Sequence, residues 1–334
     1  MLRVAIVGCG NIFTMHATSV VNLPDVTIVG VCDVKKERAD LQAEKYHTTP
    51  YYDYKEMLSR EKPDVVHICL PHYLHSIVSE YALNNGINVL CEKPMALNYE
   101  DACRLVDLAA EKKLKYGVIF QCRYNDSSKR VKEVIKSGRL GKILGVRVVL
   151  TWNRSDEYYS LSDWKGTWDK EGGGLVINQM IHSLDIANWF IDSDIVEVQS
   201  DLKNRVHKNI EVEDTAEGIV RYANGAILMF YGSNNYCCDE PIEIRLFCQN
   251  GKVVMQYEKA KITFNNGEEI LVCQQENDIH YEKKKDYWGD QHISQIENFY
   301  NSVRNNVEPE ISGREALKTQ KLICEIYGKS GYKK

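Results

Sequence analysis

The sequence predicts an α/β domain built on a doubly wound parallel sheet, followed by an α+β domain with a large, mostly antiparallel open sheet. Strand-like and helix-like segments alternate through the first third of the chain, as in parallel sheets with right-handed crossovers. Further along, alternating runs are separated by turn pairs such as Asn224-Gly225 and Asn250-Gly251, which is typical of hairpins. We therefore expect two domains, residues 1–122 and 123–334.

In the first domain, short apolar runs predict buried strands, and polar-capped segments between them predict helices. Pro71 ends one strand, Gly86 suits the end of a helix, and Asn98 suits the start of the next. The predicted strands are residues 4–7, 26–32, 65–70, 88–91 and 116–120, and the predicted helices are residues 11–22, 35–46, 53–60, 72–85 and 98–113.

In the second domain, alternation of apolar and polar residues predicts strands with one exposed face. The strands are expected at residues 142–152, 195–203, 215–221, 226–233, 242–249 and 251–257, and the helices at 174–190, 291–304 and 314–327, after a loop at 153–171. We expect the last helix to pack back toward the first domain. Apolar side chains on the open face of the sheet, such as Ile227, Met229 and Tyr231, favour a homo-oligomer.

Composition narrows the class of protein. The 334 residues are 44% hydrophobic and 27% charged, with a formal net charge of −5, so no nucleic-acid footprint is evident. No apolar run approaches the roughly 20 residues that span a bilayer. The chain starts directly on a strand, which predicts a cytoplasmic protein. Eleven cysteines without any CxxC pair indicate reduced thiols rather than a metal site.

The first strand runs into a glycine turn, and the second strand ends in an acid. Gly8 permits unusual backbone angles and Gly10 allows a phosphate to approach the start of a helix, while Asp33 suits the hydroxyls of a ribose. This βαβ pattern predicts a dinucleotide site, and Asp33 favours NAD over NADP. Lys35 and Lys36 would soften the repulsion of a 2′-phosphate, so NADP stays open. Phe13 occupies the third glycine position, which predicts a displaced helix or a ring covering the cofactor edge.

Two further patterns carry side chains suited to chemistry. Lys93 follows the strand at residues 88–91, at the edge of a parallel sheet where ligands bind, or is simply a surface residue beside Pro94. Asn178 and His182 are four residues apart behind three glycines, so they share a helical face. They either meet a polyol or belong to an ordinary buried face, with Asp185 as a structural partner.

Taken in order, the GCGNI start, the Glu92-Lys93-Pro94 tripeptide and the GGG helix with Asn178, His182 and Asp185 resemble the Gfo/Idh/MocA family, along essentially the whole chain. The resemblance implies a Rossmann domain that binds NAD(P) and a second domain that completes the substrate site and forms dimers or tetramers. It implies catalytic roles for Lys93 and His182. The cofactor-binding residues it implies are Gly8, Gly10, Asn11, Ile12, Asp33, Leu70, Pro71, His72, His75, Glu92, Lys93, Gln121, Arg123, Trp164 and Lys165. The implied substrate pocket comprises Asn178, Arg123, Tyr124, Asn125, Tyr159 and Trp164, with Tyr158 and Trp168 as further aromatic candidates.

The reaction that this resemblance implies is NAD-dependent oxidation of a secondary hydroxyl of a sugar, cyclitol or sugar derivative. Inositol dehydrogenase-like members carry Asp where this chain has Asn178, and an amide does not titrate. A proton relay would then rest on His182 and Lys93. The Asn-Gln-x-x-His pattern is similar to a branch with nucleotide-sugar 3-dehydrogenases. Two alternatives stay open: a non-catalytic dinucleotide-binding sensor, and an enzyme of glycosidase or lyase type that retains its NAD.

Overall fold

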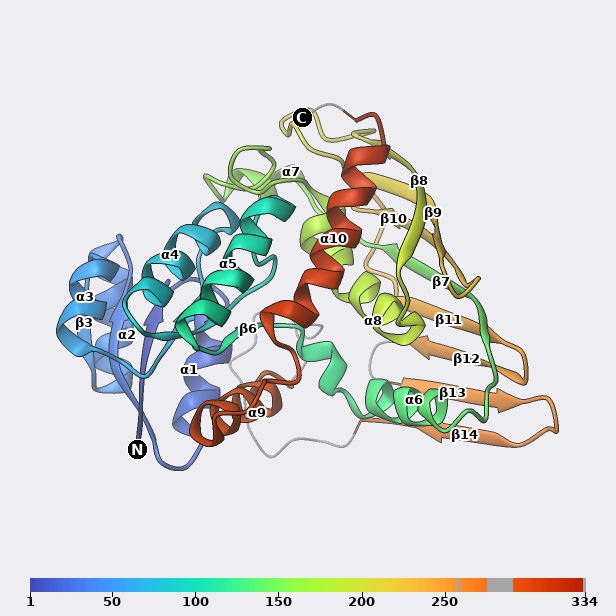
Figure 1. Cartoon of the computed structure of the whole chain (residues 1–334). Coiled ribbons are helices and arrows are strands. Elements are labelled where there is room, and N and C mark those ends of the chain that lie inside the picture. The colour runs from blue at the N-terminus through green and yellow to red at the C-terminus, as the bar shows by residue number, and fades with distance from the viewer. Residues whose placement is uncertain (257–258, 275–290, 333–334) are drawn as a thin grey trace. The chain divides into compact units, whose positions relative to one another are not determined.

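The computed structural model describes residues 1–256, 259–274 and 291–332 (Figure 1). The described chain forms two compact units. The first contains residues 1–121 and the described residues 291–317, and the second contains the remainder. Helix α10 (Gly313–Lys329) begins in the first unit and continues into the second. Among the described residues, no helix is both long and apolar enough to cross a membrane.

The first unit is built on a six-stranded parallel sheet in the order β3-β2-β1-β4-β5-β6, which confirms the doubly wound prediction. The predicted strands are present, and the short edge strand β3 is additional, because Thr49-Pro50-Tyr51 offers only three residues and one of them is proline. The strands are β1 (Leu2–Val7), β2 (Val26–Cys32), β3 (Thr49–Tyr51), β4 (Val65–Ile68), β5 (Asn88–Cys91) and β6 (Tyr116–Val118).

The helices of this unit begin close to the predicted positions. Asn98 caps α5 by accepting a hydrogen bond from the Asp101 N–H at 2.7 Å, and Asp53 caps α3 in the same way. Helix α1 starts at Phe13, two residues later than predicted, and the Phe13 ring is fully buried in the core against Tyr46. The helices are α1 (Phe13–Val21), α2 (Lys36–Tyr46), α3 (Tyr54–Glu61), α4 (His72–Asn84), α5 (Tyr99–Lys112) and α9 (His292–Asn305), which packs on α1.

The second unit contains an eight-stranded sheet in the order β14-β13-β12-β11-β7-β10-β9-β8. Every neighbouring pair is antiparallel except β7 with β10, which confirms the prediction of a mostly antiparallel sheet. Its strands are β7 (Ile143–Thr151), β8 (Ile195–Lys203), β9 (Thr215–Tyr222), β10 (Ile227–Ser233), β11 (Glu243–Cys248), β12 (Gly251–Gln256), β13 (Lys259–Phe264) and β14 (Glu269–Val272); residue 257, the end of one predicted strand, lies outside the described residues.

One face of this sheet is covered by helices and the other carries exposed apolar side chains. Helix α8 (Ile181–Ile191) packs on β7, and α6 (Asp126–Lys136), which we did not predict, packs on β13 and β14 (Figure 1). On β10, Leu228 and Phe230 are buried, whereas Met229 and Tyr231 are 40% and 37% exposed. The alternation therefore separates a helix-covered face from an open one.

The predicted helix at 174–190 is interrupted at its start. Residues Val176–Met180 form a π-helical turn that leads directly into α8. The preceding glycines make room for the protein itself: a Cβ on Gly173 would lie 2.1 Å from the Tyr327 hydroxyl, and one on Gly174 would lie 2.2 Å from the Glu213 carbonyl oxygen. A π-turn of this kind often marks a functional site. A short helix, α7 (Asp156–Ser160), also lies within the predicted loop at 153–171.

Candidate functional site

In the first unit, the predicted cofactor residues lie together because β1, β2, β4 and β5 are parallel and end at one edge. Gly8 has a φ of +99°, and an added Cβ would lie 2.2 Å from the Cys69 carbonyl oxygen, so only glycine fits. An added Cβ on Gly10 would meet nothing within 4 Å, which leaves space above the turn for a phosphate. Asn11 and Ile12 complete the turn into α1.

Asp33 is fixed at the end of β2 by the main chain. Its two carboxylate oxygens accept hydrogen bonds from the Cys9 N–H and the Lys35 N–H, both at 2.9 Å. The side chain is partly exposed. The carboxylate therefore faces solvent beside the glycine turn in a fixed orientation, as the binding of ribose hydroxyls requires. These features fit the nucleotide that the sequence predicts.

His75 joins the ends of β4 and β5. Its buried ring nitrogens bond the carbonyl oxygens of Leu70 and Pro94, each at 2.7 Å. Burial lowers the pKa of His75. Pro71 caps α4, and His72 is buried in the first turn of that helix. His75 is thus placed to hold the two strand ends together, next to Lys93.

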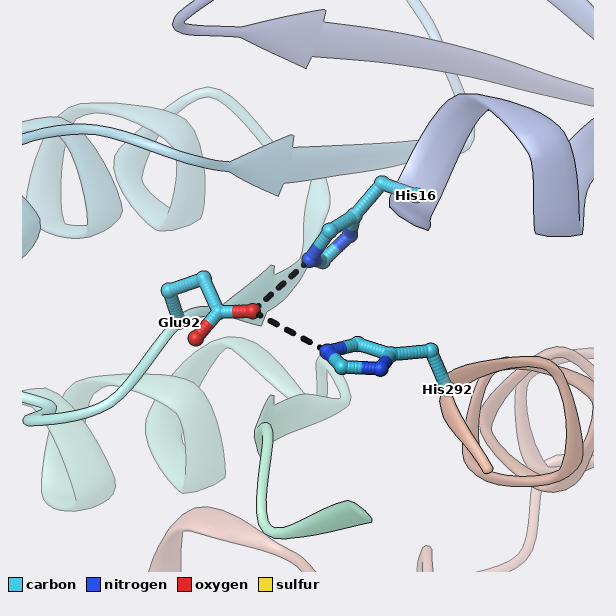
Figure 2. Close-up of side chains that lie close together, drawn as sticks. All are labelled: His16, Glu92 and His292. Atoms are coloured by element: carbon cyan, nitrogen blue, oxygen red, sulfur yellow. Dashed lines mark hydrogen bonds and ion pairs between the residues drawn. The ribbon is translucent and has the colours of Figure 1, made fainter. Parts of the chain in front are cut away.

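Glu92 is a buried carboxylate directly before Lys93. Its Oε1 accepts a hydrogen bond from His16 Nε2 at 2.9 Å and lies 3.7 Å from His292 Nε2, and its Oε2 accepts from the Lys93 main-chain N–H at 3.3 Å. Figure 2 shows both imidazoles pointing at the carboxylate, His16 from α1 and His292 from α9. Burial raises the pKa of Glu92, but hydrogen bonds from His16 and His292 outweigh it and hold that pKa well below its usual range.

In the second unit, Arg123 is committed to a buried ion pair. It lies in a 3₁₀ turn, Gln121–Tyr124, and its Nε and one terminal nitrogen reach the two oxygens of Asp185 at 2.7 and 2.6 Å. The Thr319 hydroxyl donates to Asp185 at 2.6 Å. Asp185 therefore has a structural partner, but that partner is Arg123, which the sequence did not indicate. Tyr124 is buried beside Lys129, and Asn125 is buried at the start of α6.

Asn178 meets a carboxylate that we did not predict. Its amide nitrogen donates to Glu171 Oε1 at 2.6 Å, and burial raises the pKa of Glu171 to about 7. Burial lowers the pKa of Lys165 to about 8, and its ammonium lies 3.7 Å from the centre of the Tyr158 ring. The structure thus gathers Asn178, Lys165 and Tyr158 around Glu171. The position of Glu171, directly before three glycines, was the only signal in the sequence.

The remaining candidates of this unit differ in their surroundings. His182 follows the π-turn on α8 and is partly exposed. Trp164 is partly exposed beside Lys165. Tyr159 is buried, and its hydroxyl accepts from Asn234 at 3.2 Å. Trp168 donates to the Glu211 carbonyl and packs on Tyr327, as a packing residue would.

A buried carboxylate anchors the start of the π-turn. Glu213 accepts hydrogen bonds from the Gly174 and Val176 N–H groups at 3.0 and 2.9 Å, and the Tyr327 hydroxyl donates to it at 2.7 Å. The same hydroxyl accepts from the Ile177 N–H at 3.2 Å. These bonds satisfy the first N–H groups of the helix that carries Asn178 and His182.

Comparison with known proteins decides the family. Residues 2–120 match the oxidoreductase family model with an NAD-binding Rossmann fold, and residues 128–254 match the GFO/IDH/MocA C-terminal domain. The chain belongs to the Gfo/Idh/MocA family. The resemblance stated from the sequence is therefore confirmed, and with it the Rossmann fold, NAD as cofactor and an oxidoreductase function.

Relatives cover almost the whole chain. It is 28% identical to a D-glucoside 3-dehydrogenase of Escherichia coli over 98% of this chain and 94% of the relative, and 24% identical to a myo-inositol 2-dehydrogenase of Thermotoga maritima over 94% and 92%. Among solved structures it resembles the WlbA dehydrogenase of Bordetella pertussis in complex with NADH and UDP-GlcNAcA, with 26% identity, a TM-score of 0.85, and coverage of 98% and 96%.

Proposed function

We propose that this Gfo/Idh/MocA protein is an NAD-dependent dehydrogenase that acts on a secondary hydroxyl of a sugar, cyclitol or sugar derivative. The observation that carries the proposal is the shared edge of the parallel sheet, where the glycine turn follows β1, Asp33 follows β2 and Lys93 follows β5. In such sheets ligands bind outside the carboxyl ends of the strands. The names of the relatives support the substrate class.

The proposed residue roles follow from their chemistry. NAD held by the glycine turn and Asp33 would supply the hydride acceptor for this reaction. His182 takes the proton of the substrate hydroxyl, and Lys93 donates a hydrogen bond to the same oxygen and stabilises its developing charge. Asn178, oriented by Glu171, positions the substrate. Glu92 and His75 are buried with their polar atoms bonded to the protein, so they support the site rather than contact the cofactor. The buried Arg123 likewise acts by supporting the turn on which it lies, and the other implied cofactor and substrate residues keep their predicted roles.

The substrate class is tested by a panel. The purified protein is incubated with NAD and polyols, glycosides or nucleotide sugars, and both NADH formation and thermal stability are followed. We expect at least one compound to raise the melting temperature only when NAD is present, and to give NADH. Protein that melts identically with every compound, or that arrives loaded with NAD and forms no NADH, would speak against a dehydrogenase that releases its coenzyme.

The choice of coenzyme gives a separate prediction. We expect Asp33→Ser to raise the preference for NADP over NAD at least about tenfold in kcat/KM, because it removes the charge that repels a 2′-phosphate. Lys35 and Lys36 are retained to bind the phosphate. Steady-state kinetics with both coenzymes measure the ratio. Asp40→Ser, on the exposed surface of α2, is the control, and an unchanged ratio in Asp33→Ser would place the ribose elsewhere.

We further propose a homo-oligomer in which a second copy covers the open face of the eight-stranded sheet. On that face, Met229 lies beside Ile219 of β9 and Arg147 of β7. Tyr231 lies beside Val149 of β7 and Glu217 of β9, so exposed apolar side chains alternate with charged ones. A patch of this kind on a sheet favours a partner with the same surface. The eleven free thiols support a cytoplasmic location for the assembly.

The oligomer is tested by mass in solution. We expect light scattering to give at least twice the 38.4 kDa of one chain, and Met229→Glu with Tyr231→Glu to return the mass toward one chain. The two introduced carboxylates would lie in the middle of the buried patch, where unpaired charges are unfavourable. Leu41→Glu, at an exposed position on α2, is the control. If the double variant keeps the mass of the wild type, the face is not the interface.

A further inference from the structure

A chain of hydrogen bonds runs through the interior of the first unit from Glu92 to a tyrosine. His16 Nε2 bonds Glu92, His16 Nδ1 bonds His67 Nδ1, and His67 Nε2 bonds the Tyr300 hydroxyl, each at 2.9 Å. The middle members, His16 and His67, and the terminal Tyr300 are fully buried. The four residues come from α1, β4, the end of β5 and α9, so the chain links elements that are far apart in the sequence.

The donors and acceptors of these hydrogen bonds can be assigned in only one way. An ionised carboxylate accepts hydrogen bonds and donates none, so His16 Nε2 carries the proton that faces Glu92. His16 Nδ1 then accepts from His67 Nδ1, and His67 Nε2 accepts from the Tyr300 O–H. Both imidazoles are neutral in this arrangement, and burial indeed lowers the pKa of His16 and His67. Each tautomer is therefore fixed by the two ends of the chain.

A proton conduit does not fit these groups. Burial raises the pKa of Tyr300 well above its usual range, so this end of the chain does not release a proton at neutral pH. The lowered pKa values of the two imidazoles make an additional proton equally unfavourable there.

A metal ion does not fit well either, although His16, Glu92 and His292 offer ligand atoms within 4.8 Å of one another (Figure 2). A ligating imidazole normally donates its second N–H to an acceptor. His292 Nδ1 is buried and has no hydrogen-bond partner in the part of the chain that the structure describes.

We propose that this chain is a positioning device for Lys93: His16, backed by His67 and Tyr300, keeps the Glu92 carboxylate ionised and fixed, so that its second oxygen anchors the main chain of Lys93. The proposal rests on the catalytic role proposed above for Lys93. His292, with its Nε2 3.7 Å from the same carboxylate oxygen, is a second and weaker support.

Among the groups that face Glu92, His16 has the main influence on the ionisation of the carboxylate. Burial raises the pKa values of the Cys69 and Cys91 thiols, so these neighbours are uncharged at neutral pH, as His16 and His67 are. His75 directs both ring nitrogens to main-chain carbonyl oxygens rather than to Glu92. Lys93 is the cationic residue adjacent in sequence, and His292 approaches from α9. Loss of the His16 hydrogen bond would leave a buried carboxylate with a poorer donor set, which favours its protonated form.

Two substitutions of His16 separate the two bonds of its ring. In His16→Asn the amide lies near the former Nδ1 and keeps a partner for His67, but no donor reaches Glu92. In His16→Gln the amide nitrogen lies near the former Nε2 and still donates to Glu92. We measure the melting temperature of each protein from pH 8 to pH 5, without substrate, so that this result does not depend on the proposed activity.

The expected size of the effect differs between the variants. In the wild type the pKa of Glu92 lies below its unfolded value of about 4.3, so Glu92 costs no stability as the pH falls from 8 to 5. In His16→Asn the folded pKa rises above the unfolded value, so stability is present at low pH and lost as the pH rises. His16 itself has a lowered pKa, so the wild type loses stability on acidification, and both variants remove that loss. Both should therefore gain melting temperature relative to the wild type as the pH falls, and His16→Asn should gain more than His16→Gln because of Glu92. Parallel curves for the two variants would overturn the proposal.

Turnover tests the link to Lys93. With the substrate found by the panel, we expect kcat of His16→Asn to fall at least about tenfold with little change in KM, the loss deepening toward pH 5, while His16→Gln keeps most of the activity. If the melting curves behave as expected but kcat does not change, Glu92 does not position Lys93 and the proposal fails. If no compound is turned over by the wild type, the proposed function fails, and the melting curves alone decide whether His16 controls Glu92.

Milder variants guard against loss of folding. Tyr300→Phe removes only the hydroxyl at the end of the hydrogen-bond chain. Its melting temperature should change with pH in the same direction as that of His16→Asn, but by less. Tyr51→Phe, which loses a hydroxyl bond to Glu61 in the same unit, is the matched control and should not show this change. Added Zn²⁺ should leave the melting temperature unchanged. If Zn²⁺ raised the melting temperature of the wild type but not that of His292→Asn, the proposal would be overturned in favour of a metal site.

Discussion

Replacing Lys93 with methionine should reduce turnover by at least about a thousandfold while NAD binding changes by less than about threefold. Methionine keeps most of the length of the side chain and removes the ammonium that stabilises the developing charge on the substrate oxygen. Positioned groups of this kind contribute factors of about 10² to 10⁴ each, and Lys93 would serve both proton exchange and charge stabilisation. Steady-state kinetics give kcat, and titration of the protein with NADH by fluorescence gives the dissociation constant.

A second lysine variant makes the result specific. Lys112→Met lies at the end of α5 and removes an exposed ion pair with Glu111, so its kinetics should match the wild type. If Lys93→Met kept near-normal turnover, the mechanism proposed here would be rejected. If it lost NAD binding as well, Lys93 would serve the binding of the coenzyme rather than the chemistry.

Replacing Arg123 with methionine should destabilise the protein by about 3 to 5 kcal/mol, because it leaves the Asp185 carboxylate buried without its cation. Arg123 and Asp185 are 4% and 1% exposed, and two short hydrogen bonds join them. The Thr319 hydroxyl would still donate to Asp185. Urea unfolding followed by circular dichroism measures the loss as a shift of the midpoint.

An exposed pair of the same kind provides the comparison. Arg130 and Glu133 are joined at 3.0 Å on the surface of α6, so Arg130→Met should cost at most about 0.5 kcal/mol. Asp185→Asn leaves the Arg123 guanidinium buried without its anion, so it should cost about as much as Arg123→Met. An Arg123→Met protein as stable as Arg130→Met would mean that water reaches Asp185 and that the pair is not truly buried.

Three strands could be predicted to the residue. Apolar runs bounded by polar residues mark the ends of β2 and β5, and alternation of apolar and polar residues marks β8, most of whose residues are at least partly exposed. Helix α6 was missed because its segment, from Asp126 to Lys136, is mostly polar and its apolar stripe is narrow. The π-turn at Val176–Met180 was missed because it depends on Tyr327 and Glu213, which local sequence does not reveal.

In the candidate site too, residues within local motifs could be predicted, whereas side chains from distant parts of the sequence could not. Sequence motifs identified Gly8, Asp33 and Lys93, because the strand, turn and helix around each of them are consecutive in the sequence. The supporting side chains come from elsewhere: His292 and Tyr300 lie on α9, about 200 residues beyond Glu92, and no local pattern connects them. From the sequence, we interpreted Asn178 as a position that lacks a carboxylate. In the structure, the carboxylate of Glu171, seven residues upstream, accepts a hydrogen bond from the Asn178 amide.

The bonds of Tyr327 set a limit on how this protein can be shortened or tagged. Its hydroxyl sits where Gly173 lacks a side chain and ties Glu213 to the first turn of the helix that bears Asn178 and His182. Deleting the final turns of α10 would therefore loosen a segment 150 residues upstream, although those turns lie near the end of the chain. Affinity handles belong after residue 332, and any trimmed version for crystallisation should keep that phenol.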